Sequence, residues 1–310
     1  MKNVLITGVA GNIGSALASA LIKTGRYKVI GVDNLSTGSL HKVPAAGASF
    51  SFIKADVNCY EDISAIFFAN KVDLVFHFAA VVGVARTLAN PLAVLNDIAG
   101  IKNVLSLSKN SVVERVFFSS SSEVYGEPVS IPQYEDSTPL NSKLPYAIVK
   151  NLGEAFCRAF YQEHHLRYTI FRFFNTYGPN QSDDFVIPRF INLALRNIDI
   201  PIYGDGSQTR TFCYVDDNVD AMLACLEKDI FINEVVNIGS DVEMSILDLA
   251  HIVLKITGST SAIRYLPKLP EGDMTRRRPD VSKMRIALSR ELLPVDQGIS
   301  KLIAHFTENR

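Results

Sequence analysis

The feature that most constrains this chain is a regular alternation of short apolar runs with helical patterns over its first two-thirds. Between the runs, apolar residues recur at helical spacing, as Ile13, Leu17 and Leu21 do. Strands that are apolar on both faces and separated by helices form a parallel sheet that is covered on both sides. We therefore predict an α/β, Rossmann-like, doubly wound domain. The predicted strands cover residues 4–6, 29–32, 50–53, 74–76, 112–118 and 168–171, and the clearest helices cover residues 13–23 and 147–164.

The pattern changes after residue 174, where turn-forming residues become frequent. We predict that residues 1–174, together with one returning strand, form the dinucleotide-binding domain. Residues 175–310 then form a smaller substrate-binding region over the carboxyl ends of the strands. No long linker separates the two parts, so we expect them to pack as one unit. The elements predicted beyond residue 174 are helices over 187–196 and 245–256, the second with Ser245 as its N-cap, and a strand over 235–238.

Composition and charge limit the partners and the compartment. The chain has 31 basic and 32 acidic residues, a balance that favours neither nucleic acid nor a membrane surface as partner. None of its four cysteines forms a C-x-x-C pair, which is typical of reduced thiols. The apolar run near the N-terminus is too short for a signal peptide, and no stretch is long enough to span a bilayer. We expect a cytoplasmic protein without a metal site.

A glycine-rich turn, residues 7–14, joins the first strand to the first helix. Gly8, Gly11 and Gly14 would let the backbone approach a pyrophosphate, which the amides and dipole of the helix would attract. Asp33 ends the second strand, where a carboxylate accepts hydrogen bonds from the ribose of NAD and repels a 2′-phosphate. This pattern favours NAD over NADP. The alternatives are a glycine turn without a ligand and an aspartate that only caps the next turn.

A second group of residues carries acid–base chemistry. Lys150 follows Tyr146 by four residues, so a helix places both side chains on one face. A lysine cation favours the phenolate, which can take a proton from a sugar hydroxyl. Residues 119–122 are four serines where the fifth strand ends, at the sheet edge where ligands bind. The alternative is a polar strand exit without a function.

Taken together, these residues resemble the extended short-chain dehydrogenase/reductase family, in its nucleotide-sugar epimerase/dehydratase branch. The resemblance covers nearly the whole chain. Its motifs are Thr7 to Gly14, His77-Phe78-Ala79-Ala80, Ser121 before Val124-Tyr125-Gly126, Tyr146 with Lys150, Phe174 to Pro179, Gly204 to Arg210, and Arg277 to Asp280.

The resemblance implies a role for each matching position. The implied catalytic residues are Ser121, Glu123, Tyr146 and Lys150. Contacts to NAD are implied for Gly8, Gly11, Asn12, Ile13, Gly14, Asp33, Asn34, Asp56, Val57, Phe78, Ala79 and Ala80, and for the catalytic Tyr146 and Lys150. Contacts to the nucleotide sugar are implied for Ser122, Asn175, Val186, Tyr203, Arg210 and Arg277. The resemblance also implies a homodimer, formed through the helices over 93–109 and 147–164.

In this branch, hydride leaves C4 of the sugar and later returns, and an event between the two steps decides the product. Glu123 resembles the decarboxylases, whereas the apolar segment over residues 78–84 resembles epimerases. Ser122 stands where an acidic pair would favour dehydration, and Asp97 stands where many relatives carry Asn, beside Asn96. We expect C4 epimerisation of a UDP-hexose or UDP-hexuronate. The alternatives are UDP-glucuronate decarboxylation, 4,6-dehydration, and, in a different class, an NAD-binding sensor without turnover.

Overall fold

The computed structural model describes residues 1–267 and 276–308, and a parallel sheet of seven strands forms its centre. Each neighbouring pair of strands in this sheet is parallel. The predicted doubly wound α/β fold is therefore confirmed. In spatial order the strands are β11 (Glu234–Ile238), β6 (Tyr168–Phe173), β5 (Arg115–Ser121), β4 (Leu74–His77), β1 (Lys2–Thr7), β2 (Tyr27–Asp33) and β3 (Phe50–Lys54).

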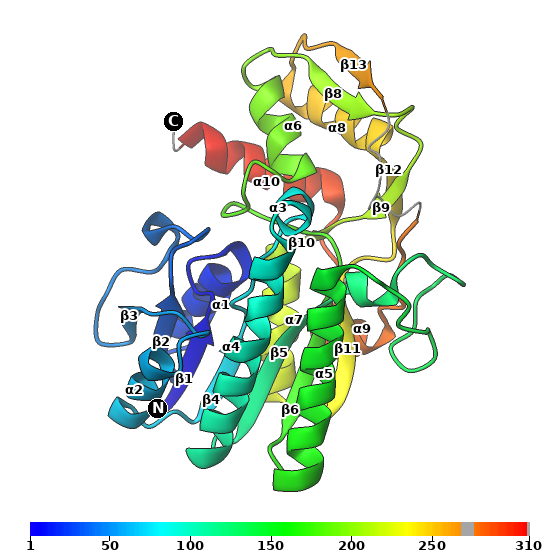
Figure 1. Ribbon diagram of the computed structural model, residues 1–310. Coiled ribbons are helices and arrows are strands. Elements are labelled where there is room, and N and C mark those ends of the chain that lie inside the picture. Colours follow the sequence, from blue (N-terminus) through cyan, green and yellow to red (C-terminus); the bar gives the residue numbers. More distant parts are fainter. Residues whose placement is uncertain (268–275, 309–310) are drawn as a thin grey trace.

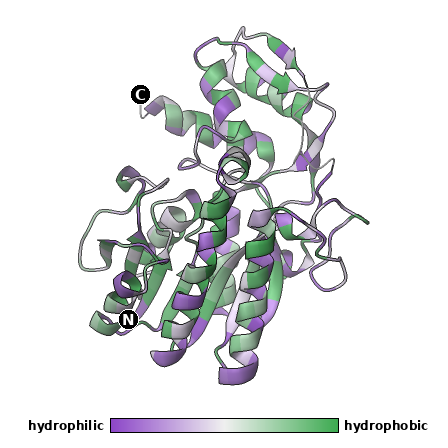
Figure 2. Cartoon of the chain, viewed as in Figure 1, coloured by the Kyte–Doolittle hydropathy of each residue, from purple (hydrophilic) through white to green (hydrophobic). Residues whose placement is uncertain are grey.

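Helices cover both faces of this sheet (Figure 1). On one face α1 (Asn12–Lys23) packs against α7 (Val215–Glu227). On the other face α2 (Tyr60–Ala69), α4 (Pro91–Asn110) and α5 (Pro145–His164) lie side by side. Alternate side chains of one strand serve the two faces, since Val4 and Ile6 belong to the α1 side of the core and Leu5 to the α4 side. The strands of the sheet accordingly are mostly hydrophobic in Figure 2, whereas the outer surfaces of the helices are mixed.

The second region lies above the carboxyl ends of the strands (Figure 1). Its hydrophobic side chains continue the core of the α1 side without a break, which explains why the two parts need no linker. Ser245 caps α8 as predicted, because its Oγ accepts a hydrogen bond from the amide of Asp248 at 2.9 Å. The elements of this region are β7 (Thr176–Tyr177), α6 (Val186–Ala194), β8 (Ile200–Tyr203), β9 (Thr209–Thr211), β10 (Cys213–Tyr214), β12 (Glu243–Ser245), α8 (Ile246–Thr257), β13 (Ile263–Leu266) and α10 (Val295–Glu308).

Three short elements lie in connections, and α9 closes the sheet edge beside β11. The three connecting elements are η1 (Leu40–Lys42), α3 (Val84–Ala89) and η2 (Ser122–Tyr125), and α9 covers Ser282–Leu288. Among the described residues, no helix combines the length and the apolar character that crossing a membrane requires.

The predicted boundaries of the fifth strand were wrong by three residues. The strand covers Arg115–Ser121 rather than residues 112–118. Val112 instead lies in the turn after α4, with a φ of 54° and 85% of its surface exposed. The serines extend the strand because they pair with β6, Ser121 opposite Phe173. The predicted helix over 187–196 likewise covers Val186–Ala194, and the chain turns at Asn197, whose φ is 53°.

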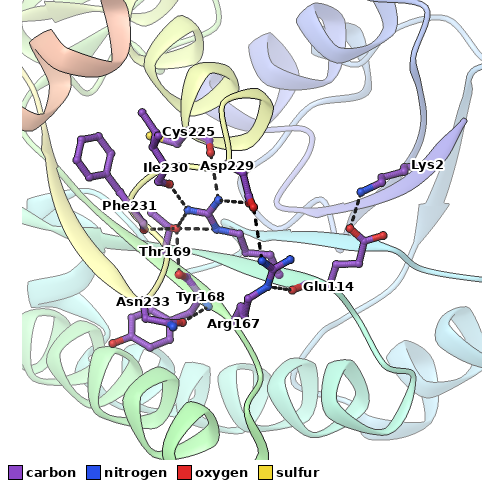
Figure 3. A network of polar contacts seen from close by, with 11 residues as sticks. Lys2, Glu114, Arg167, Tyr168, Thr169, Cys225, Asp229, Ile230, Phe231 and Asn233 are labelled. Carbon is purple, nitrogen blue, oxygen red and sulfur yellow. Dashed lines mark hydrogen bonds and ion pairs between the residues drawn. The ribbon is translucent and has the colours of Figure 1, made fainter.

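A network of polar contacts that includes Thr169, Cys225 and Ile230 lies at the amino ends of the strands, away from the serines at the carboxyl end of β5 (Figure 3). Arg115 begins β5, and its guanidinium donates to Thr169 Oγ1 on β6 and to the carbonyls of Cys225 and Ile230 around the end of α7. Only 1% of Arg115 is exposed. These contacts occupy the amino ends of the strands. The carboxyl ends of the strands are therefore the side of the sheet that is available for a site.

Candidate active site

The glycine-rich turn lies at the carboxyl end of β1, and its glycines have different tasks. Gly8 has a φ of 74°, and a Cβ there would lie 2.7 Å from the amide nitrogen of Ala79. A Cβ on Gly14 would lie 2.3 Å from the carbonyl oxygen of Gly8. Both glycines are therefore required by the packing of the chain itself. A Cβ on Gly11 would meet only the Gly8 oxygen, at 3.3 Å, so this side of the turn is open.

This turn fits the pyrophosphate of a dinucleotide. Gly11 directly precedes α1, so the first amides of the helix face the open side of the turn. Asn12 Oδ1 is buried without a hydrogen-bond partner among the described residues, and Ile13 follows it in the first turn of the helix. A buried polar atom of this kind costs free energy until a ligand or water satisfies it.

The carboxylate of Asp33 stabilises the glycine-rich turn through hydrogen bonds to backbone amides. Its Oδ2 accepts a hydrogen bond from the amide of Ala10 at 2.9 Å, and its Oδ1 accepts one from the amide of Leu35 at 2.8 Å. The structure thus gives Asp33 the turn-capping contacts of the alternative interpretation. Each carboxylate oxygen keeps a second acceptor site, so contact with a ribose hydroxyl remains compatible with these bonds.

The predicted cofactor residues beside the glycine-rich turn follow the carboxyl ends of β2 and β3. Asn34 Nδ2 donates to Asp56 Oδ2 at 3.2 Å, and Asp56 Oδ1 accepts from the amide of Asn58 at 2.9 Å. Val57 between them is buried. The structure therefore brings the predicted cofactor residues of these two strand ends together.

A contact that the sequence did not indicate positions Phe78 and Ala79. The Thr7 hydroxyl lies 2.8 Å from His77 Nδ1 and 3.2 Å from the amide nitrogens of Phe78 and Ala79. Burial, and next the charge of Lys150, lower the pKa of His77 to about 3. The imidazole is thus neutral, and its Nδ1 can accept the Thr7 proton while the hydroxyl accepts from the two amides.

One face of α5 meets the end of β5. Lys150 Nζ donates to the carbonyl of Ser119 at 2.7 Å, and the Tyr146 hydroxyl is hydrogen-bonded to Ser121. Lys150 Nζ lies 5.7 Å from the centre of the Tyr146 ring. The structure therefore brings the three predicted catalytic residues, Ser121, Tyr146 and Lys150, into one cluster.

Burial dominates the electrostatics of this cluster. It raises the pKa of Tyr146 above the ordinary value, an effect that the Ser121 hydrogen bond and the charge of Arg277 oppose and that Glu123 and Asp97 increase. Burial also lowers the pKa of Lys150 to about 8, against the opposing charge of Asp97. A lysine that titrates near physiological pH suits proton transfer.

Glu123 lies beside this cluster and forms an ion pair that the sequence did not indicate. Arg277 Nη2 donates to Glu123 Oε1 at 2.6 Å, and both side chains are largely buried. The amide of Glu123 donates to Ser121 Oγ at 3.2 Å. Glu123 Oε2 is buried and has no hydrogen-bond partner among the described residues. Arg277, expected to contact the nucleotide sugar, therefore contacts a predicted catalytic carboxylate.

The other predicted substrate residues are spread over several elements. Asn175 Nδ2 donates to the Thr211 carbonyl at 3.0 Å, and Arg210 Nη1 donates to the Thr209 carbonyl at 2.7 Å. Ser122 is buried in η2, Val186 begins α6, and Tyr203 ends β8. A shallow cavity of about 600 Å³ follows Tyr203 and is lined by Gly204, Asp205, Tyr265, Leu266 and Pro267. In the part of the chain that the structure describes, no cluster of His, Cys, Asp and Glu could hold a metal ion.

The sheet, the glycine turn and the Tyr–Lys–Ser cluster agree with a comparison to protein families. A profile of the NAD dependent epimerase/dehydratase family matches residues 4–239. The chain belongs to this family. It is therefore an NAD-dependent enzyme of the extended short-chain dehydrogenase/reductase class, as the motifs predicted, and the open side of the glycine turn fits this cofactor.

Individual relatives extend over the whole chain. A UDP-N-acetyl-alpha-D-glucosaminuronate decarboxylase from Bacillus cytotoxicus is 36% identical over 99% of this chain and 98% of its own length. The crystal structure of a UDP-glucose 4-epimerase from Thermotoga maritima with UDP-glucose has a TM-score of 0.92 and 32% identity, over 99% of both chains. That of a UDP-glucuronic acid 4-epimerase from Bacillus cereus with UDP-glucuronic acid and NAD has a TM-score of 0.89 and 30% identity, over 99% of this chain and 100% of the other.

Proposed function

We propose that the protein epimerises a UDP-hexose or UDP-hexuronate at C4 through a transient 4-keto sugar. The observation that carries the proposal is the cluster of Ser121, Tyr146 and Lys150 at the same sheet edge as the glycine turn. The similarity of the whole fold to UDP-sugar 4-epimerases supports it.

In this mechanism, Tyr146 takes the proton of the C4 hydroxyl while Ser121 holds that oxygen in place. Lys150 stabilises the phenolate form of Tyr146, which is the form that can accept this proton. The glycine-rich turn over residues 7–14 would hold NAD, which would supply the acceptor for the hydride of C4 and the donor for its return. The apolar loop at Val81 and Val82 offers no side-chain hydrogen bond that would hold the keto sugar in one orientation. The sugar can therefore turn and present its other face, and Tyr146 returns the proton to O4.

A second candidate function is decarboxylation of a UDP-hexuronate, which the position of Glu123 favours. Its Oε2 is buried without a partner and its Oε1 is paired with Arg277, close to Ser121. Such a group can act on the sugar beyond C4, where a 4-keto group makes the C5 carboxylate labile. The 36% identical decarboxylase supports this alternative.

Product analysis separates the two functions. The purified protein is mixed in turn with UDP-glucose, UDP-N-acetylglucosamine and UDP-glucuronate, and the products are examined by chromatography and mass spectrometry. We expect an isomer of unchanged mass. Release of carbon dioxide from UDP-glucuronate would establish the second function instead, and the absence of turnover with each sugar would refute both.

We also propose a homodimer in the cytoplasm. Large apolar side chains are exposed on the outer surfaces of α4 and α5, among them Leu92 at 77% and Ile148 at 47%. These two helices pack side by side, so their outer faces form one surface that a second copy can cover. The four cysteines are free thiols, three of them buried, as in proteins of a reducing compartment.

A further inference from the structure

Three consecutive arginines, residues 276–278, belong to a segment that pairs with the loop before α5. The carbonyl of Arg278 accepts a hydrogen bond from the amide of Gln133 at 2.8 Å, and the amide of Asp280 donates to the Gln133 carbonyl at 2.9 Å. These two bonds form an isolated parallel bridge between Gln133 and Pro279. Because side chains alternate along an extended chain, neighbouring arginines of this segment should face opposite sides.

The arginines indeed pair with carboxylates of different elements. Arg277 Nη2 donates to Glu123 Oε1 at the end of β5, at 2.6 Å. Arg276 donates from Nε and Nη2 to the two carboxylate oxygens of Glu243 on β12, at 3.1 and 2.8 Å. The charge of Arg278 also acts on Glu243. The segment is therefore attached on one side to the sheet and on the other side to β12.

Glu243 is the side chain that joins this segment to β9. Strand β12 pairs with β9 in an antiparallel ribbon (Figure 1). Glu243 Oε1 accepts a hydrogen bond from Thr209 Oγ1 of β9 at 3.1 Å, in addition to its bonds from Arg276. Thr209 directly precedes Arg210, and Arg276 directly precedes Arg277. One carboxylate thus binds the chain neighbours of two arginines that are predicted to contact the nucleotide sugar.

The separation of those two arginines matters for a ligand with two phosphates. Guanidinium groups match phosphate oxygens, so the diphosphate is the part of a UDP-sugar that a pair of arginines suits. Arg210 and Arg277 are 8% and 7% exposed, so the place of each guanidinium depends on the segment that carries it. The bidentate pair of Glu243 with Arg276 allows one orientation of the guanidinium, and the negative charge of Glu243 offsets repulsion among the arginines.

We propose that Glu243 is a positioning residue for the nucleotide diphosphate, because it fixes the segments that carry Arg210 and Arg277 relative to each other before the ligand binds. Glu243 acts through Arg276 and Thr209 and does not contact the ligand in this role. The inference rests on the proposed function, in which a UDP-sugar is the ligand. A segment that is already ordered in the free protein costs less to order on binding, which raises affinity.

The first test compares ligands with and without a diphosphate. The Kd of the NAD-bound protein is measured for UDP by calorimetry and for uridine by ligand-observed NMR. Glu243→Gln keeps the size of the side chain and an acceptor for Thr209 but removes the charge. The Kd for UDP should rise roughly three- to tenfold, and that for uridine should stay unchanged. Arg276→Gln should have the same effect, and the double variant no larger one, because the two side chains act as a unit.

Asp241→Asn is the matched control. Asp241 lies two residues before Glu243 and pairs with Arg285 of α9 at 3.2 Å. The side chains of Asp241 and Glu243 have similar exposed fractions, 23% and 20%. The Asp241 pair joins no segment that carries a predicted substrate residue, so its loss should change neither Kd.

The outcomes of the binding test separate this inference from the proposed function. Equal Kd values for UDP in the parent and in Glu243→Gln would overturn the inference alone. A Kd for uridine that rises as much as that for UDP would overturn it as well, because such a change indicates a general loosening of the site. Absence of UDP binding in the parent would refute the proposed function and, with it, this inference.

The second test separates KM from kcat with the nucleotide sugar that is turned over. A residue that positions the diphosphate acts on binding rather than on the reacting carbon. Glu243→Gln should therefore raise KM by about the same factor as the Kd for UDP and should change kcat much less. A fall in kcat at unchanged KM would contradict the proposal, because it would place the effect of Glu243 at the reacting groups.

Discussion

At the scale of single residues, the site keeps two groups in environments that oppose their charged forms. Burial raises the pKa of Tyr146 and lowers that of Lys150, so water stabilises neither the phenolate nor the ammonium. Electrostatic interactions inside such a site are stronger than they would be in water. The arrangement suits proton transfer but lowers the stability of the fold.

We predict that Lys150→Met stabilises the protein while it abolishes turnover. The folded-state pKa of Lys150, about 8, is below its unfolded value of 10.5, which corresponds to about 3 kcal/mol of destabilisation while the lysine is charged in both states. Loss of the hydrogen bond to Ser119 in Lys150→Met offsets about 1 kcal/mol of this gain in stability. Urea unfolding at pH 7 should show a net gain of roughly 1–2 kcal/mol.

The pH dependence of that gain has a definite sign. Below pH 8 the penalty is complete, and between pH 8 and 10.5 the folded state releases the proton and the penalty shrinks. The advantage of Lys150→Met should therefore decrease as the pH rises from 8 to 10. An advantage that is equal at pH 7 and pH 10 would contradict the burial argument.

Tyr146→Phe should lower kcat by a factor on the order of 10²–10⁴, because it removes the acid–base group and leaves the ring in place. Affinity for the nucleotide sugar, measured by calorimetry, should change little. Tyr161→Phe is the matched control: Tyr161 lies on the same helix, and 39% of it is exposed. A Tyr146→Phe variant that keeps full turnover would remove Tyr146 from the mechanism.

Residues of this kind could be found from the sequence only where local spacing identifies them. Tyr146 and Lys150 are four residues apart, so their shared face follows from helix geometry. The Thr7–His77 contact and the Glu123–Arg277 pair join positions that are 70 and 154 residues apart. No local pattern fixes such partners, because strand order and the path of the second region bring them together.

At the scale of secondary structure, one helix face and one strand end determine the geometry of the reacting groups. Glu154 follows Lys150 by one turn, and Ser120 Oγ donates to its Oε1 at 2.6 Å. The Arg172 guanidinium on β6 donates to both oxygens of Glu154, at 2.8 and 2.7 Å, and also to the Tyr125 hydroxyl at 2.9 Å. These contacts fix α5 along β5, so that Tyr146 and Lys150 stay opposite the serines.

The buried pair of Glu154 and Arg172 anchors α5 to the sheet. Replacing one of its two members should lower the free energy of unfolding far more than replacing an exposed charged residue on the same helix. Glu154 and Arg172 are almost completely buried, so Glu154→Gln leaves a buried guanidinium without its counter-charge. We expect a loss of about 3–5 kcal/mol in the free energy of unfolding, measured with urea. Glu163→Gln on the same helix, where the side chain is 71% exposed, should change it by less than about 0.5 kcal/mol. Similar losses in the two variants would show that the anchor is not needed.

Element types could be predicted from the sequence more closely than element ends. The apolar periodicity identified each strand of the sheet, but β5 was placed three residues too early because Val112 and Val113 look like strand residues. Serines look like loop residues, yet pairing with β6 continues the strand through Ser121. Tertiary pairing thus overrode intrinsic preference at the residues that matter for the site.

At the scale of the whole molecule, the two regions share one core. Side chains of α6, α8 and α10 belong to the same hydrophobic cluster as those of α1 and α7. Ser121, the predicted catalytic serine, lies on β5 of the sheet, whereas Arg277 follows α8 in the second region and pairs with Glu123. Continuous packing explains how residues from the two regions can be held at hydrogen-bond distance, since independent domains would move relative to each other.

Exposed apolar side chains on the outer surface of α4 and α5 lead us to predict that the molecule is a homodimer. Leu92 and Ile148 are exposed on adjacent helices, and a two-fold axis between copies would bury both at once. The double variant Leu92→Glu/Ile148→Glu should therefore be monomeric in sedimentation velocity, because burying two carboxylates per subunit costs more than the interface contributes. Phe68→Glu on α2, where the ring is 78% exposed, introduces a similar charge away from this surface and should leave the dimer intact. If both variants sediment like the parent, the contact between copies lies elsewhere.

Since α5 also carries Tyr146 and Lys150, a dimer formed here would place its interface on the outer face of the helix that carries the predicted catalytic residues. The monomeric double variant should then have a lower kcat than the parent as well as a lower sedimentation coefficient.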